Sequence, residues 1–130
     1  MKQLQPREAH AYLKDNPEAL FIDCRSEMEF LFVGHPQGAT HVPWNDGPDW
    51  EVNPHFVADV KKLAGNGLER PVVVICRSGQ RSFLAGEALE AAGFVEVVNV
   101  VHGFEGELDE QHHRSSRSGW RFDGLPWEQS

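Results

Sequence analysis

The sequence predicts an α/β domain in which a central parallel sheet of about five strands carries helices on both faces. Two observations lead to this fold class. Short apolar runs alternate with segments whose apolar residues recur at helical spacing. The chain also has 130 residues, of which 40% are hydrophobic, and this suits one domain with its own core. We therefore expect a single domain over residues 1–130.

The first half of the chain supplies a helix and two of the expected strands. Pro6 suits the first turn of a helix, which is expected to end at 16–17, where a second proline follows an asparagine. The run 19–24 (ALFIDC) is typical of a buried strand. Residues 34–42 are expected to form a loop that leads into a short strand.

The second half continues the alternation. An asparagine and a proline at 53–54 indicate the start of a helix, and 71–76 (PVVVIC) is the clearest strand of the sequence. A helix over 83–92 and a last strand over 95–101 follow. Residues 107–130 begin as a polar stretch without periodicity. They are expected to form an irregular extension whose aromatic end packs back on the domain.

Composition and charge exclude several function classes. Twelve basic and twenty acidic residues give a net charge of −8, which disfavours binding to nucleic-acid phosphates. No apolar run approaches the roughly 18 residues that span a bilayer, and the first residues lack the apolar stretch of a signal peptide. Two cysteines are too few for a disulfide framework. We expect a cytoplasmic protein without nucleic-acid or membrane partners, in which a thiol stays reduced.

Cys76 is the main candidate for a reactive residue. It ends the strand over 71–76, and a small polar loop leads from it into a helix expected to begin near Arg81 or Ser82. Ligands of open α/β sheets bind at the carboxyl ends of strands. The unpaired N–H groups at a helix start attract anions, and Arg77 and Arg81 add positive charge. Such surroundings favour the thiolate of a cysteine, which is otherwise a minor form at neutral pH.

Several motifs, in their order along the chain, resemble the rhodanese family of sulfurtransferases. The loop over 76–82 (CRSGQRS) is similar to the active-site loop of that family. Residues 21–26 resemble its Asp-Val-Arg segment, and 34–43 resemble its Gly-His…Pro segment. Residues 98–104 resemble the strand and glycine turn after the active-site helix, and 119–127 the tail of some single-domain bacterial members. The resemblance covers nearly the whole chain and implies a single rhodanese-like domain.

The resemblance also implies an activity. Cys76 would take a sulfane sulfur from thiosulfate or a similar small anionic donor and carry it as a persulfide. It would then pass the sulfur to cyanide or a thiol, and a protein could serve as donor or acceptor. Neither an organic cofactor nor a metal is implied. The substrate-binding residues implied by the resemblance are Arg77, Ser78, Gly79, Gln80, Arg81 and Ser82.

Two other functions stay open. One is a sulfur-delivery module that binds a partner protein and acts weakly on small donors. The other is a cysteine-dependent phosphatase or arsenate reductase, whose loop is longer by one residue between cysteine and arginine. Four residues separate Cys76 from Arg81, and the smaller loop suits one sulfur atom better than a phosphoryl group with three oxygens.

The residues after the first buried strand allow a structural and a chemical interpretation. Asp23 and Arg25 could form an acid–base pair, but in the rhodanese family they chiefly tie strand ends together. Cys24 could resolve the Cys76 persulfide as a disulfide, although a cysteine in an apolar run usually faces the core. Ser26, with a glutamate three residues later, predicts a capping box.

Three further features lie outside these motifs. His102 stands where the family often has a glycine, close to the loop. Four tryptophans could line a binding groove, but packing in the core and loops is the preferred interpretation. They are Trp44, Trp50, Trp120 and Trp127, and Trp44 is a candidate for a place near the pocket because it follows the 34–43 segment. His112 and His113 lie in a polar segment without other ligands at zinc spacing, so no metal site is expected.

Overall fold

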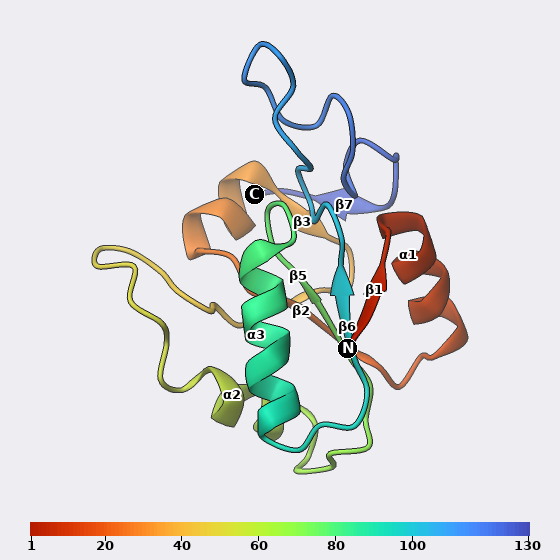
Figure 1. Cartoon of the computed structure of the whole chain (residues 1–130), viewed down its shortest axis with the longest axis vertical. Helices are drawn as coiled ribbons and strands as arrows, with labels where there is room; N and C mark the ends of the chain where they lie inside the picture. The colour runs from red at the N-terminus through yellow and green to blue at the C-terminus, as the bar shows by residue number, and fades with distance from the viewer.

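Five parallel strands form the centre of the molecule in the computed structural model, which describes residues 1–130 (Figure 1). Each strand pairs in parallel with its neighbours. Their order across the sheet is β1 (Lys2–Leu4), β6 (Val97–Val100), β5 (Val72–Ile75), β2 (Leu20–Asp23) and β4 (Thr40–His41). The predicted fold class is therefore confirmed. The edge strand β1 is not among the predicted elements, because its three residues contain no apolar run.

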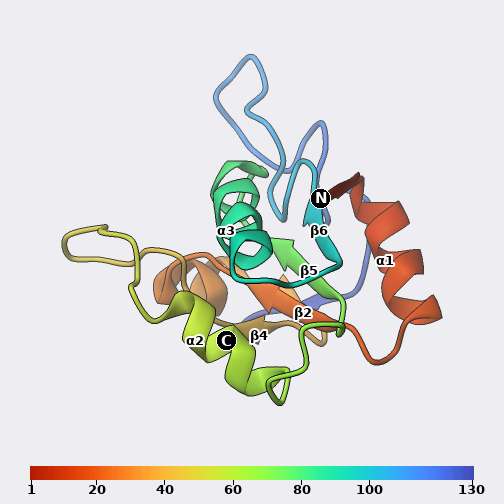
Figure 2. The ribbon, with the colours of Figure 1, turned by 60° about the horizontal axis from the view of Figure 1, so that its bottom comes forward.

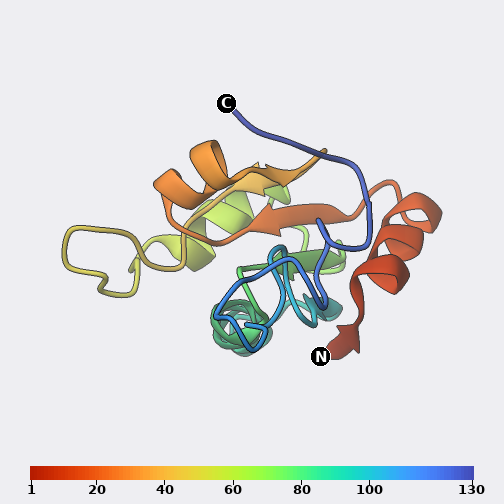
Figure 3. The ribbon, with the colours of Figure 1, turned by 90° about the horizontal axis from the view of Figure 1, so that it is seen from above.

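Helices cover both faces of this sheet (Figures 2 and 3). On one face, α2 (Phe56–Leu63) and α3 (Gln80–Ala91) enclose a core with the side chains of β2 and β5. On the other, α1 (Pro6–Asp15) contributes Ala9 to a second core. A short π-helix, η1 (Glu29–Val33), follows β2. None of these helices combines the length and the apolar character that a membrane span needs.

The alternation of side chains along β2 and β5 places both cysteines on one face. All residues of the two strands are buried. Asp23 pairs with Ile75 in the register, so the next residues, Cys24 and Cys76, follow at the same edge of the sheet. Both thiols belong to the core that α2 and α3 cover. The carboxyl ends of the central strands therefore bring the two cysteines together beside the start of α3.

The C-terminal residues return to the body of the domain. Strand β7 (Trp127–Glu128) pairs antiparallel with β3 (His35–Pro36). Trp120 is buried in the core beside α1, and its indole N–H donates to the carbonyl of Pro126 at 2.8 Å. Residues 107–119 form the projecting loop at the top of Figure 1.

Candidate active site

The backbone around Cys76 is held by the turn that follows β6. The carbonyl of Cys76 accepts a hydrogen bond from the N–H of Phe104 at 2.8 Å. Gly103 adopts φ +58° and packs so closely that an added Cβ would lie 2.4 Å from the Cys76 carbonyl oxygen. A side chain at position 103 would therefore displace the segment that carries the thiol.

Two groups of the loop contact the sulfur of Cys76. The N–H of Gly79 lies 3.1 Å from Sγ and donates to it, and the hydroxyl of Ser82 lies 3.2 Å from it. Gly79 is the N-cap of α3 and adopts φ +108°, a conformation that glycine reaches without strain. The helix begins at Gln80, slightly earlier than expected. The thiol itself is buried, with 1% of its residue exposed.

Most other backbone donors of the loop have no acceptor in the protein. The N–H groups of Arg77, Ser78, Gln80, Arg81 and Ser82 make no hydrogen bond to another protein group. At the start of a helix this is the rule, because the first N–H groups have no carbonyl before them. The loop thus carries a set of free donors and the positive end of a helix dipole, which together attract an anion.

The two arginines of the loop have different surroundings. Arg81 forms a bidentate ion pair with Glu29, with N–O distances of 2.8 and 2.9 Å. Arg77 is exposed, and its side chain makes neither an ion pair nor a hydrogen bond. Glu29 neutralises much of the charge of Arg81, so Arg77 is the cation of the loop that is free to meet an anion.

Glu29 also caps its own helical turn. Its Oε1 accepts from the backbone N–H of Ser26 at 3.2 Å and from the Ser26 hydroxyl at 2.9 Å, which confirms the predicted capping box. Burial acts to raise the pKa of the Glu29 carboxyl, but the hydrogen bonds and charge of Arg81, together with Ser26, outweigh it and lower the pKa to about 2. The carboxylate is therefore ionised throughout the neutral range.

Replacing Glu29 by glutamine is expected to lower the free energy of unfolding at neutral pH by about 2 kcal/mol. In the native chain the stabilisation by this carboxylate is present above its unfolded pKa, near 4.5, and is lost as the pH falls towards 2. Glu29→Gln should remove that pH dependence, measured by urea unfolding across this range. The exposed neighbour offers the control Glu27→Gln, which should change neither quantity. Equal acid profiles for Glu29→Gln and the native chain would contradict the assignment.

A cavity of about 610 Å³ opens beside the arginine side of the loop. It combines charged side chains with apolar ones and includes a residue of the projecting 107–119 loop. The residues that line it are Ser26, Met28, Glu29, Val33, Asn45, Trp50, Arg77, Arg81, Glu105 and Arg114. Trp44 packs against the core, in line with the preferred interpretation, and its ring centroid lies 5.3 Å from that of Phe56. Trp50 is one of the four tryptophans considered as groove residues, whereas no pattern in the sequence marks Met28.

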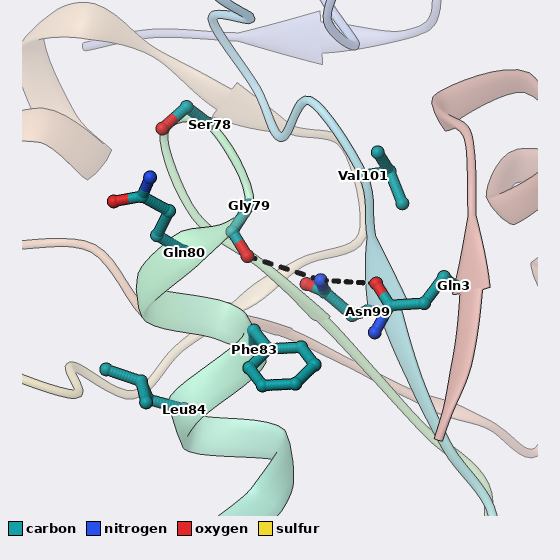
Figure 4. Close-up of a pocket in the computed structure, with 8 residues that line it drawn as sticks. All are labelled: Gln3, Ser78, Gly79, Gln80, Phe83, Leu84, Asn99 and Val101. Atoms are coloured by element: carbon teal, nitrogen blue, oxygen red, sulfur yellow. Dashed lines mark hydrogen bonds between the residues drawn. The ribbon is translucent and has the colours of Figure 1, made fainter.

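A second cavity, of about 500 Å³, lies on the other side of the loop between α3 and β6 (Figure 4). Asn99 of β6 is buried at its floor. The side-chain N–H₂ of Asn99 donates to the carbonyl of Gly79 at 3.2 Å and to Gln3 Oε1 at 2.8 Å, the two dashed contacts of Figure 4. Its Oδ1 accepts from the Ser82 hydroxyl. Asn99 therefore links β1 and β6 to the loop, a role that no motif of the sequence indicates.

Cys24 is a reduced and fully buried neighbour of Cys76. Burial raises the pKa of the Cys24 thiol well above its ordinary value, and the proximity of Cys76 and Asp23 acts in the same direction. A thiol that resists ionisation is a poor attacking group. The structure thus favours a packing role for Cys24 over the resolving role.

The variant Cys24→Val is expected to keep its sulfur chemistry and its stability at neutral pH within about 1 kcal/mol, because the side chains are similar in size. In the native chain the raised pKa of Cys24 means that its stabilisation is complete below the ordinary thiol pKa of 9.0 and is lost as the pH rises above it. The free energy of unfolding should fall there by up to about 1.4 kcal/mol per pH unit. In Cys24→Val, urea unfolding should show a smaller fall in the free energy of unfolding at alkaline pH, because the contribution of this thiol is absent. A variant that loads sulfur but cannot discharge it would instead establish the resolving role.

Asp23 and Arg25 form a buried ion pair and lie outside the loop. Neither side chain is exposed, and Nη2 of Arg25 lies 2.7 Å from Oδ2 of Asp23. Arg25 also donates to the carbonyl of Gly34 and lies over the ring of Phe104 at 4.6 Å. The pair ties three segments together and is closed to solvent, as the structural interpretation predicts.

His102 lies at the edge of the loop without contacting the thiol. It has φ +69°, and its Nδ1 is 3.5 Å from Glu107 Oε1. Its backbone N–H is the nearest atom to a Cβ built on Gly79, at 3.4 Å. The histidine thus packs its backbone, rather than its ring, against the N-cap of α3.

Comparisons with known proteins agree with this geometry. The family model for the rhodanese-like domain matches residues 5–109. The chain belongs to the rhodanese-like domain family. The resemblance noted in the sequence is thereby confirmed.

Several proteins resemble this rhodanese-like chain over most of its length. The crystal structure of Rv0390 from M. tuberculosis has 38% sequence identity and a TM-score of 0.88, and the match covers 100% of this chain and 98% of that one. The thiosulfate sulfurtransferase GlpE of Stutzerimonas stutzeri is 31% identical over 104 residues, which is 80% of this chain and 82% of that protein. An uncharacterized protein of Rickettsia conorii is 26% identical over 127 residues, covering 93% and 92%.

One further solved structure is a polysulfide-sulfur transferase homodimer from Wolinella succinogenes. It has 25% identity and a TM-score of 0.64, and the match covers 100% of this chain and 80% of that one. The rhodanese-like fold of this chain is thus shared by relatives that handle different sulfur compounds.

Proposed function

We propose that this rhodanese-like protein is a sulfurtransferase that moves a sulfane sulfur through a persulfide on Cys76. The observation that carries the proposal is the position of Cys76 beneath a loop of free backbone N–H groups, at the start of α3 and beside the unpaired Arg77. This arrangement favours a thiolate and also holds an anionic group next to it. The sulfurtransferase relatives support the same reaction class.

The reaction proceeds in two displacements that balance. With thiosulfate as donor, the Cys76 thiolate attacks the outer sulfur, the S–S bond of the donor breaks, and sulfite leaves with the electron pair. Cyanide or a thiolate then attacks the outer sulfur of the persulfide, and Cys76 leaves as the thiolate. This ping-pong scheme requires no organic cofactor and no metal.

Each loop residue has a role in this scheme. Gly79 donates its N–H to the thiolate, and the free N–H groups of the residues around it receive the charge of the outer sulfur. Ser78, Gln80 and Ser82 contribute backbone donors of this kind. Arg77 attracts the anionic donor. Arg81 is held by its ion pair with Glu29, and both residues line the cavity beside the loop.

The test is the intact mass of the protein after incubation with thiosulfate and removal of small molecules. Gain of one sulfur, lost again on addition of cyanide, is the expected result. Turnover of an aryl phosphate without sulfur uptake would overturn the proposal in favour of phosphatase chemistry.

A delivery role between proteins is a second candidate, and the cavity beside the loop favours it. Its volume of about 610 Å³ exceeds what a small inorganic anion needs, and the exposed side chains of Met28 and Trp50 border it. A protein or a larger thiol could therefore enter as donor or acceptor. Slow turnover of thiosulfate with rapid loading from a persulfide-bearing protein would favour delivery, whereas fast small-molecule turnover would count against it.

A further inference from the structure

We propose that Asn99 is a positioning residue that holds the hydroxyl hydrogen of Ser82 away from Cys76 and thereby opposes thiolate formation at the sulfur. The three side chains are buried and come from different elements: the end of β5, the first turn of α3, and β6. The role assigned to Asn99 deepens the proposed function, because it concerns the charge on the sulfur that would carry the persulfide.

The contacts of its amide fix the orientation of Asn99. The side-chain nitrogen lies 3.2 Å from the carbonyl oxygen of Gly79, which can only accept a hydrogen bond. Rotating the amide by half a turn would place two oxygens against each other there. The nitrogen therefore stays towards Gly79, as Figure 4 shows. On the other side of the amide, Oδ1 accepts the hydrogen bond of the Ser82 hydroxyl.

Ser82 has one hydrogen and two neighbours that compete for it. Oδ1 of Asn99 cannot donate, so the bond between the two side chains exists only if Ser82 donates it. The hydroxyl oxygen also lies 3.2 Å from Sγ of Cys76. With its hydrogen directed to Asn99, that oxygen can only accept from Cys76, which requires the protonated thiol.

Ionisation of Cys76 consequently changes this network. A thiolate next to the oxygen of Ser82 requires the hydroxyl to rotate and donate its hydrogen bond to the sulfur. Oδ1 of Asn99 then loses the hydrogen bond from Ser82. The inner sulfur is neutral in the thiol and also in the persulfide, whose charge sits on the outer sulfur. Asn99 therefore stabilises the thiol and the persulfide relative to the thiolate, which attacks the donor and leaves again when the persulfide is discharged.

The experiment measures the pH midpoint of thiolate formation at Cys76 by ultraviolet absorbance, in Cys24→Val protein so that Cys76 is the only thiol. Asn99→Leu should lower the midpoint by about one pH unit, because the Ser82 hydroxyl becomes free to donate to the thiolate. In a Ser82→Ala background the same substitution should have no such effect. Replacing an amide by an apolar side chain would by itself disfavour the charged sulfur, so the direction of the shift distinguishes the two explanations.

A raised or unchanged midpoint in Asn99→Leu would overturn the proposal, and so would a fall that persists without the Ser82 hydroxyl. Asn99→Val offers the same test with less bulk in a strand that already contains valines, should the leucine variant fail to fold. A second readout is the rate at which loaded protein loses its sulfur to cyanide, which should rise several-fold in the variants. The titration needs no sulfur transfer, so the role of Asn99 and the proposed function can fail separately.

Discussion

Replacing Cys76 by serine is expected to abolish sulfur transfer while the fold stays intact. The serine oxygen cannot form the S–S bond by which a cysteine carries a sulfane sulfur. It can still accept a hydrogen bond from the N–H of Gly79, which contacts Sγ in the native chain. Thiocyanate formation from thiosulfate and cyanide should drop to the uncatalysed rate. The intact mass should show no added sulfur.

The matched control for this loss is the neighbouring cysteine. Cys24 lies at the same edge of the sheet and in the same core, so Cys24→Val changes a comparably buried thiol without touching the loop. It should keep full transfer. If Cys76→Ser folded and still produced thiocyanate at the native rate, sulfur would have to travel by another group, and the proposed mechanism would be wrong.

The variant Arg25→Met is expected to lower the free energy of unfolding by about 3–5 kcal/mol. It removes the cation from a pair in which neither side chain is exposed and leaves the carboxylate of Asp23 buried without its partner. It also removes the donor to the Gly34 carbonyl and the cation over the Phe104 ring. Since a domain of this size has a total stability of about 5–15 kcal/mol, a large part of it depends on this one side chain. Urea denaturation at neutral pH measures the change.

A double replacement distinguishes two contributions to the free energy of unfolding: the destabilisation by an unpaired buried charge and the stabilisation by the intact ion pair. Asp23→Leu combined with Arg25→Met removes both charges, and buried ion pairs exchanged for apolar residues often recover stability. The double variant should therefore be more stable than Arg25→Met alone. A loss below about 1 kcal/mol in Arg25→Met would mean that the pair does not hold these segments together.

The central strands and the position of Cys76 could be predicted from the sequence, because both depend on local patterns. A parallel strand covered on both faces is a continuous apolar run, and both 19–24 and 71–76 have this form. A break in such a run, followed by a polar loop and a helix, marks the edge where ligands bind. The position of Cys76 at this edge follows from local pattern alone.

The partners of the loop could not be predicted in this way. Glu29 was expected to cap its own turn with Ser26, three residues away, and it does. Its second partner, Arg81, is 52 residues further along the chain, and no local pattern records that contact. Asn99 is hidden from sequence reasoning for the same reason, because its bond to Ser82 joins a strand to a helix across 17 residues. Such pairings exist only once the sheet has set the distances between its strands.

The burial of Cys76 is expected to restrict which reagents can reach its sulfur. Only 1% of the residue is open to solvent, so a reagent can contact little of the sulfur from outside the protein. A donor with an unhindered terminal sulfur, such as thiosulfate, is expected to reach the sulfur of Cys76. Disulfides with large groups on both sulfur atoms are expected to be excluded by steric hindrance. If Cys76 carries out the proposed sulfur transfer, its burial would thereby protect it from large thiol-reactive molecules.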